Sequence, residues 1–158
     1  MPFDAFLKLD GIKGESTDKQ HKDEIEVLSF SFGVTHAATP IGAGGVPRAD
    51  VQDFSIVKNT DVASPKLFVT ACAGQRIQQA LFSVRRRAGG ASQTADMLRI
   101  TLTDVLVSSV TPGGSAGGAS DRPMETVSFD FSKIEIEYTP ATTGVPKPPK
   151  VSCETHKT

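Results

Sequence analysis

The fold is decided by residues 125–139, ETVSFDFSKIEIEYT. Apolar side chains alternate with polar ones from Val127 to Phe131, and again from Ile134 to Tyr138, but with the opposite parity. Because successive side chains of a strand point to opposite faces, this shift moves the apolar set to the other face of the sheet. The pattern predicts either a bulge at Ser132-Lys133 or a strand that is covered on both faces.

The same change of parity occurs at two other places in the chain. One lies between Val27 and Leu28, and the other lies near Asp104. Three such changes predict a small curled β-domain with apolar surface on more than one side. We expect one side to form the core and the other to face a partner, such as a second copy of the chain.

Size and composition limit the class of protein. The chain has 158 residues, of which 38% are hydrophobic, and this suits one domain. The formal net charge of -1 gives no electrostatic reason to expect nucleic acid or an anionic membrane as a partner. No apolar run is long enough to span a bilayer, and residues 1–10 lack the features of a signal peptide. We expect Cys72 to be buried and Cys153 to be an exposed thiol in the tail.

Periodicity and turn residues predict a mainly β chain with one helix. The helix is expected at Ser64–Ala73, with Ser64 as N-cap and Gly74 at its C-terminal end. Its expected apolar stripe consists of Leu67, Phe68, Ala71 and Cys72. The expected strands are 3–10, 22–34, 51–58, 76–87, 97–110 and 124–139.

Candidate catalytic and metal-binding patterns are weak. Residues 113–117 (GGSAG) match the nucleophile elbow G-x-S-x-G, but a loop follows Ser115 where that chemistry needs a helix. His21 and the other two histidines share no ligand spacing, so we expect exposed histidines, no metal and no cofactor. The cluster 85–87 (RRR) is interpreted as a solvated strand end, or as a contact with an acidic patch on a neighbour.

These observations favour a structural protein that self-associates and is not an enzyme. Two alternatives remain. One is a monomeric β-barrel that binds a ligand, and the other is a serine hydrolase that uses Ser115.

A series of short stretches resembles the haemolysin-coregulated protein (Hcp) family, the tube subunits of bacterial type VI secretion systems. The resemblance covers about residues 3–139. The stretches are FLKLDGIKGES (6–16), EIEVLSFSFG (24–33), VQDF (51–54), SPKL (64–67), RAGG (87–90), DVLVSSV (104–110) with GGS (113–115), and ETVSFDF (125–131).

The resemblance implies a small β-barrel of two packed antiparallel sheets with one flanking α-helix, over residues 1–139. Residues 140–158 are then a Pro- and Lys-rich tail, expected to be flexible. Six copies form a ring, and rings stack into a tube that sheath contraction expels. The implied partners are sister subunits, the sheath, spike and baseplate proteins, and effector proteins carried in the lumen. Such a protein is made in the bacterial cytoplasm and secreted without a signal peptide.

Two loops are candidate interface segments. The loop 35–50 is long and rich in glycine, and such loops are often functional. We expect it to contact a neighbouring subunit or ring, through His36, Pro40, Ile41, Gly42, Gly44, Gly45, Val46 and Arg48. The loop that contains Gly113, Gly114 and Ser115 is expected near the lumen.

Overall fold

The computed structural model describes residues 3–36, 49–87, 96–117, 121–140 and 144–155. Within them the chain is mainly β with one helix, α1 (Ser64–Ala73), so the predicted fold class is confirmed in outline. The strands are β1 (Phe3–Leu9), β2 (Ile25–Val27), β3 (Ser29–Ser31), β4 (Val34–His36), β5 (Ala49–Val51), β6 (Phe54–Asn59), β7 (Arg76–Arg86), β8 (Asp96–Gly113), β9 (Met124–Asp130), β10 (Lys133–Tyr138) and β11 (Val151–Glu154).

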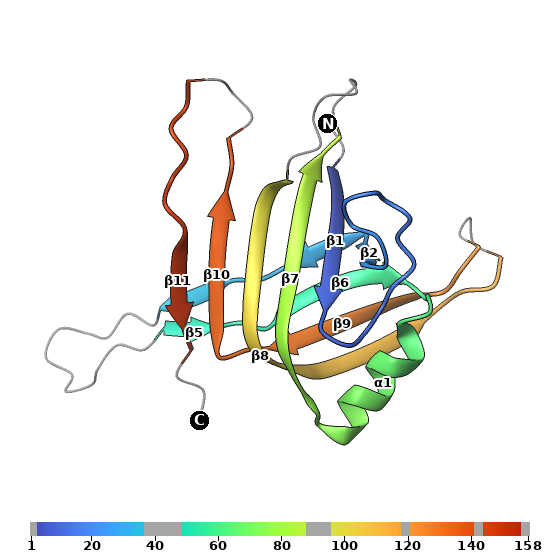
Figure 1. Cartoon of the computed structure of the whole chain (residues 1–158). Coiled ribbons are helices and arrows are strands. Elements are labelled where there is room, and N and C mark those ends of the chain that lie inside the picture. The colour runs from blue at the N-terminus through green and yellow to red at the C-terminus, as the bar shows by residue number, and fades with distance from the viewer. Residues whose placement is uncertain (1–2, 37–48, 88–95, 118–120, 141–143, 156–158) are drawn as a thin grey trace, which may run out of the picture.

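Nine of these strands form one antiparallel sheet. Its order is β2-β1-β7-β8-β9-β6-β3, and β10 branches from β8 and carries β11 on its far side. Strands β1, β7, β10 and the first half of β8 stand upright in Figure 1, while β6 and β9 cross behind them. The strands β4 and β5 form a separate two-stranded sheet.

The predicted barrel is an open, curled sheet. Strands β2 and β3 lie at the two ends of the sheet order and do not pair with each other among the described strands. They are consecutive in sequence and separated only by Leu28, whose N–H donates to the Val57 carbonyl at 2.8 Å. The sheet therefore curls far enough for its ends to be joined by the chain, without a closed ladder of hydrogen bonds.

The parity change in residues 125–139 is a corner of the sheet. Strand β8 pairs with β10 through residues 98–103 and with β9 through residues 106–113, so β9 and β10 share one edge of β8. The Ser132 N–H donates to the Thr103 carbonyl at 3.0 Å where the two meet. Asp104, the next residue of β8, has a φ of 56°, which reverses the parity of that strand at the same point.

This corner corrects the prediction of apolar surface on two sides. Phe129, Phe131 and Ile134 are all buried in the same core although their parity differs, and so are Leu102 and Val105 on either side of Asp104. The chain turns from one layer into the other, so both apolar sets face inward. At the third parity change Leu28 is exposed (51%), and the strand predicted over 22–34 is divided there into β2 and β3.

Helix α1 connects β6 to β7 and packs with its inner face on the core. Leu67 is fully buried, and Gly74 has a φ of 62°, as expected for the left-handed C-terminal residue. Two expectations are wrong, because the N-cap is Ala63 and because Phe68 and Cys72 are exposed. Leu67 and Ala71 of the predicted stripe do face the core, but Ser64 and Thr70 take the remaining inward positions, which leaves Phe68 and Cys72 on the solvent side.

Part of the predicted tail belongs to the sheet. Strand β11 lies antiparallel to β10, with Cys153 opposite Ile134. It forms the outermost strand on the left of Figure 1. Lys147 and Lys150 pair with Glu137 and Glu135 of β10 at 2.8 and 3.1 Å, and these contacts add to the strand pairing.

Candidate functional site

The loop between β1 and β2, residues 10–24, lies across the sheet and is here called the strap. Its first half contacts β7, α1 and the loop that precedes α1. Asp10 N–H donates to the Gln79 carbonyl of β7, Lys66 of α1 donates to the Gly11 carbonyl, and Glu15 accepts from the Val62 N–H at 3.1 Å. Glu15 also pairs with Arg122, which precedes β9, at 3.3 Å. The strap therefore ties together elements that are far apart in sequence.

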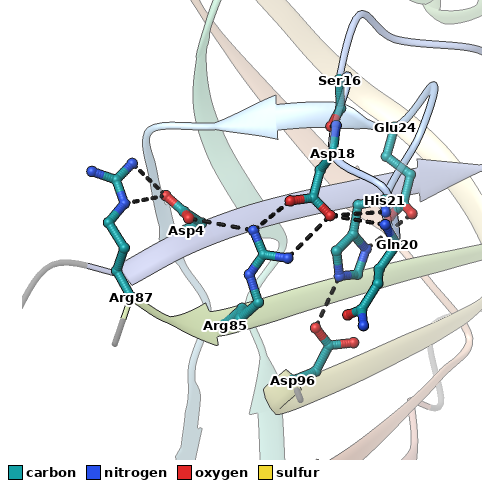
Figure 2. Close-up of polar contacts among 9 residues, drawn as sticks. All are labelled: Asp4, Ser16, Asp18, Gln20, His21, Glu24, Arg85, Arg87 and Asp96. Carbon is teal, nitrogen blue, oxygen red and sulfur yellow. Dashed lines mark hydrogen bonds and ion pairs between the residues drawn. The ribbon is translucent and has the colours of Figure 1, made fainter. Parts of the chain in front are cut away.

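The second half of the strap is bound to β7 through a bidentate ion pair. Arg85 donates from Nη1 and Nη2 to the two carboxylate oxygens of Asp18, at 3.0 and 2.6 Å (Figure 2). The guanidinium lies 5.3 Å from the centre of the Phe6 ring, where a cation–π contact adds to the attraction. The hydrogen bonds from Arg85 lower the pKa of Asp18 to about 2.

The basic cluster 85–87 is therefore paired within the chain. Asp4 accepts two hydrogen bonds from Arg87, at 3.1 and 2.6 Å, and lies 3.5 Å from Arg85 (Figure 2). These contacts from Arg87 and Arg85 lower the pKa of Asp4. Arg86 contacts Met97 Sδ at 3.3 Å. The acidic groups that the cluster meets come from β1 and the strap. Arg86 and Arg87 are exposed, as the interpretation of a solvated strand end expected, whereas Arg85 is largely covered.

His21 lies near the C-terminal end of the strap and is buried (5% exposed), so the expectation of exposed histidines is wrong for it. Its Nδ1 lies 3.0 Å from Glu24 Oε2 and its Nε2 lies 2.9 Å from Asp96 Oδ1 (Figure 2). The ring stacks on Phe6 with 4.4 Å between the ring centres. Two carboxylate partners and a ring contact compensate for the loss of water, which explains the burial.

A second buried polar cluster holds the start of α1. Lys58 of β6 is fully buried, and its Nζ donates to Asp61 at 2.8 Å, to Ser64 Oγ at 3.1 Å and to Glu125 of β9. Ser64 Oγ donates to Glu125 at 2.5 Å. The cluster connects two strands with the helix, and its ion pairs and hydrogen bonds satisfy the buried charges.

Sequence reasoning missed both clusters. The His21 and Glu24 pair has a spacing of three residues, which could have been noticed, but Asp96 is 75 positions away. Lys58 and Glu125 are 67 positions apart. A single sequence carries no signal for such pairs before the strand order is known.

The predicted stacking segment is only partly within the described residues. His36 is exposed at the end of β4, and Pro40, Ile41, Gly42, Gly44, Gly45, Val46 and Arg48 lie outside the described part of the chain. Beside His36, Val34 is 62% exposed. The strands β4 and β5 continue the β3–β6 pair outward, since the Gln52 N–H donates to the Gly33 carbonyl at 2.8 Å between the two ladders.

The loop predicted near the lumen joins β8 to β9. Gly113, Gly114 and Ser115 are exposed and line a hollow together with Arg122 and Met124. The described chain after this loop runs into β9, so Ser115 lies between two strands. A nucleophile elbow needs a helix after the serine, so this geometry does not support the hydrolase alternative.

No group of three or more histidine, cysteine or acidic side chains suited to a metal ion occurs among the described residues. The same residues contain no helix that is long and apolar enough to cross a membrane.

Comparison with known proteins identifies the family. The family model described as "Type VI secretion system effector, Hcp" matches residues 6–138. Protein hcp1 of Pseudomonas aeruginosa is 40% identical over 142 residues, which cover 89% of this chain and 85% of that protein. The chain belongs to the Hcp family of the type VI secretion system, as the resemblance predicted.

Solved structures of other members show the same fold. Hcp1 from Salmonella typhimurium is 36% identical with a TM-score of 0.74, covering 87% of this chain and 88% of that one. A type VI secretion system effector from Yersinia pestis is 31% identical with a TM-score of 0.77, covering 96% of this chain and all of that one.

Proposed function

We propose that the chain is a structural subunit of the type VI inner tube, in which hexameric rings stack into a conduit that sheath contraction expels. The observation that carries the proposal is the family match over residues 6–138. The subunit acts without catalytic chemistry. Its partners are sister copies, the sheath, spike and baseplate proteins, and effectors held in the lumen. It is made in the bacterial cytoplasm and secreted by this system without a cleaved signal.

The β4–β5 pair supports contact between copies. The pair extends the β3–β6 ladder beyond the core, and its side chains, Val34 among them, are largely exposed, so a neighbouring copy can bury them. The segment between these strands, 37–48, contains most of the residues predicted for ring stacking. We therefore propose that the β4–β5 ribbon, defined as residues 34–51, reaches to the adjacent ring. We also propose that the loop Gly113–Ser115 faces the lumen.

Light scattering on a sizing column tests the ring. A hexamer of the 16.7 kDa chain has a mass of about 100 kDa, six times that of the monomer. A single 16.7 kDa species at every concentration would contradict the ring and favour the monomeric ligand-binding alternative.

Electron microscopy of assembled tubes tests the ribbon. Val34→Glu places a charge on β4, and Val69→Glu places the same charge on the outer face of α1, where valine is equally exposed (62% and 64%). We expect Val34→Glu, like deletion of 41–46, to shorten or abolish tubes while rings persist, and Val69→Glu to leave tubes unchanged. Normal tubes with Val34→Glu would contradict the role of the ribbon.

Co-expression with an effector tests the lumen loop. Ser115→Arg is expected to lower the amount of effector in the cell while the ring remains intact on the sizing column. Normal effector amounts would contradict the placement of this loop at the lumen.

A further inference from the structure

Strand β11 is attached to the sheet on one side only. Among the described strands it pairs with β10 alone, and all four of its residues are exposed, Val151 to 55%. It stands at the left margin of the sheet in Figure 1, beside β10. The strand buries little apolar surface when it docks, so its main-chain hydrogen bonds and the charges of the segment before it supply most of its stability.

The edge of β10 carries two carboxylates on one face. Glu135 and Glu137 are two residues apart, so their side chains point to the same side of the strand, about 7 Å apart along it. Lys147 Nζ lies 2.8 Å from Glu137 Oε1. Lys150 Nζ lies 3.1 Å from Glu135 Oε2, and Lys133 of the same strand lies 3.1 Å from the other oxygen of that carboxylate. Two acidic side chains of the edge thus meet two basic side chains of the segment that leads into β11.

The spacing of the two lysines matches the spacing of the two carboxylates. Lys147 and Lys150 enclose Pro148 and Pro149, and such a proline pair favours the polyproline II helix. That helix has three residues per turn, so side chains three positions apart lie on the same side, about 9 Å apart. The flexible lysine stems bridge the remaining difference. A segment that is extended before it docks also loses less conformational entropy on docking.

The main chain adds a ladder and an anchor at the far end. Strand β11 runs antiparallel to β10, with Val151 opposite Ile136. Beyond the strand, the Thr155 N–H donates to the Ser132 carbonyl at 2.8 Å, and the Thr155 hydroxyl donates to the Phe131 carbonyl at 2.6 Å. This is the way in which a peptide strand adds to a sheet edge, where main-chain bonds give affinity and side chains of the edge give selectivity.

We propose that the outer edge of β10 is a docking site for a basic extended strand, and that residues 144–155 occupy it as a releasable ligand. The partner that it fits is the same segment of a second copy of this chain, because that segment has the same lysine spacing and the same register. Both lysines are about half exposed (53% and 52%), and exposed ion pairs are weak and screened by salt. The segment therefore leaves the edge for part of the time, and a sister copy then takes its place. The proposal does not rest on ring formation.

Two full-length variants separate release of the segment from a change of net charge. Lys147→Glu/Lys150→Glu places two further negative charges against the carboxylates of β10, so it should release residues 144–155. Lys13→Glu/Lys19→Glu makes the same change of net charge at two exposed positions of the strap, and it leaves the segment in place.

Binding of a labelled peptide tests the docking site. The probe is a fluorescent peptide of residues 144–155 that carries Cys153→Ser, and its anisotropy is measured at low salt. We expect it to bind the Lys147→Glu/Lys150→Glu chain at least about tenfold more tightly than wild type or the strap variant, because the edge is unoccupied for more of the time. Absence of binding to the released variant, or equal binding to all three proteins, would overturn the proposal.

The same peptide with both lysines replaced by glutamate tests the selectivity of the edge. We expect it to bind none of the three proteins, because it places like charges against Glu135 and Glu137. Equal binding of the two peptides to the released variant would overturn the role of the lysine spacing.

Hydrogen–deuterium exchange of the full chain tests what holds the strand. The backbone amides of residues 151–155 should be about tenfold less protected in Lys147→Glu/Lys150→Glu than in wild type. Wild type should lose part of this protection at about 0.5 M NaCl, where the Debye length is about 4 Å, while the amides of β7 stay protected. Protection of 151–155 that changes neither with the variant nor with salt would overturn the proposal.

Discussion

Replacing Asp18 by asparagine measures how strongly β7 holds the strap. The substitution keeps the size of the side chain but removes the charge that receives the bidentate hydrogen bonds from Arg85. A carboxyl group whose pKa falls from 3.8 to about 2 on folding favours the folded state at neutral pH by about 2.4 kcal/mol. The Asp18 side chain is 23% exposed, so solvent screening reduces this to about 1–2 kcal/mol.

The sign of the pH dependence follows from the lowered pKa. The stabilisation by Asp18 is fully present above the unfolded value near 3.8 and is lost as the pH falls through the folded value of about 2. Near pH 3 roughly half of the difference between wild type and Asp18→Asn should remain.

Urea denaturation at pH 7 and pH 3, at one protein concentration, gives the two free energies of unfolding. Glu15→Gln is the matched control, because its pair with Arg122 is exposed on both sides and should contribute less than about 0.5 kcal/mol. The reasoning fails if Asp18→Asn and Glu15→Gln have the same small effect, or if the effect of Asp18→Asn does not shrink at pH 3.

Three further substitutions test the core, the buried ion pair and the corner, each by chemical denaturation. Leu67→Ala should cost about 2–5 kcal/mol because this side chain is fully buried, whereas Val69→Ala on the exposed face should cost less than about 0.5 kcal/mol; similar values would contradict the orientation of α1. Lys58→Met should lower the free energy of unfolding by about 3–5 kcal/mol, because it leaves the Glu125 carboxylate buried without its cation. Adding Glu125→Leu should restore part of this loss. A double variant that loses as much stability as the two single variants together would contradict the ion pair. Asp104 has a φ of 56°, which glycine adopts readily and a β-branched residue does not. Asp104→Gly should therefore be nearly neutral, whereas Asp104→Val should lower the free energy of unfolding by about 1–3 kcal/mol. Equal effects would contradict the left-handed backbone at the corner of the sheet.

The short-range features of the fold were predictable from the sequence. Alternation predicted most of the strands, and Gly74 marked the end of the helix. These features depend on neighbours within a few residues, which one sequence displays directly. The parity change at Ser132-Lys133 was also visible in the sequence, but the sequence did not show that it is a corner of the sheet. The corner depends on the contact between Ser132 and Thr103, which forms only because β9 and β10 both pair with β8.

The polar clusters were not predictable for a related reason. Asp18 and Arg85 are 67 positions apart, and nothing local in either segment indicates the partner. The orientation of α1 was missed because Ser64 was read as a capping residue, whereas the buried charge of Lys58 draws its hydroxyl inward. Long-range pairs of charges are recognised only after the sheet has brought them together.

Strand β8 belongs to both layers of the molecule, and its change of direction is concentrated at Asp104. A single inserted or deleted codon on either side of that position would invert the facing of every side chain up to the end of the strand. Variation in chain length at this place is therefore expected to be rejected by selection, while the loop after Gly113 can lengthen or shorten without that penalty.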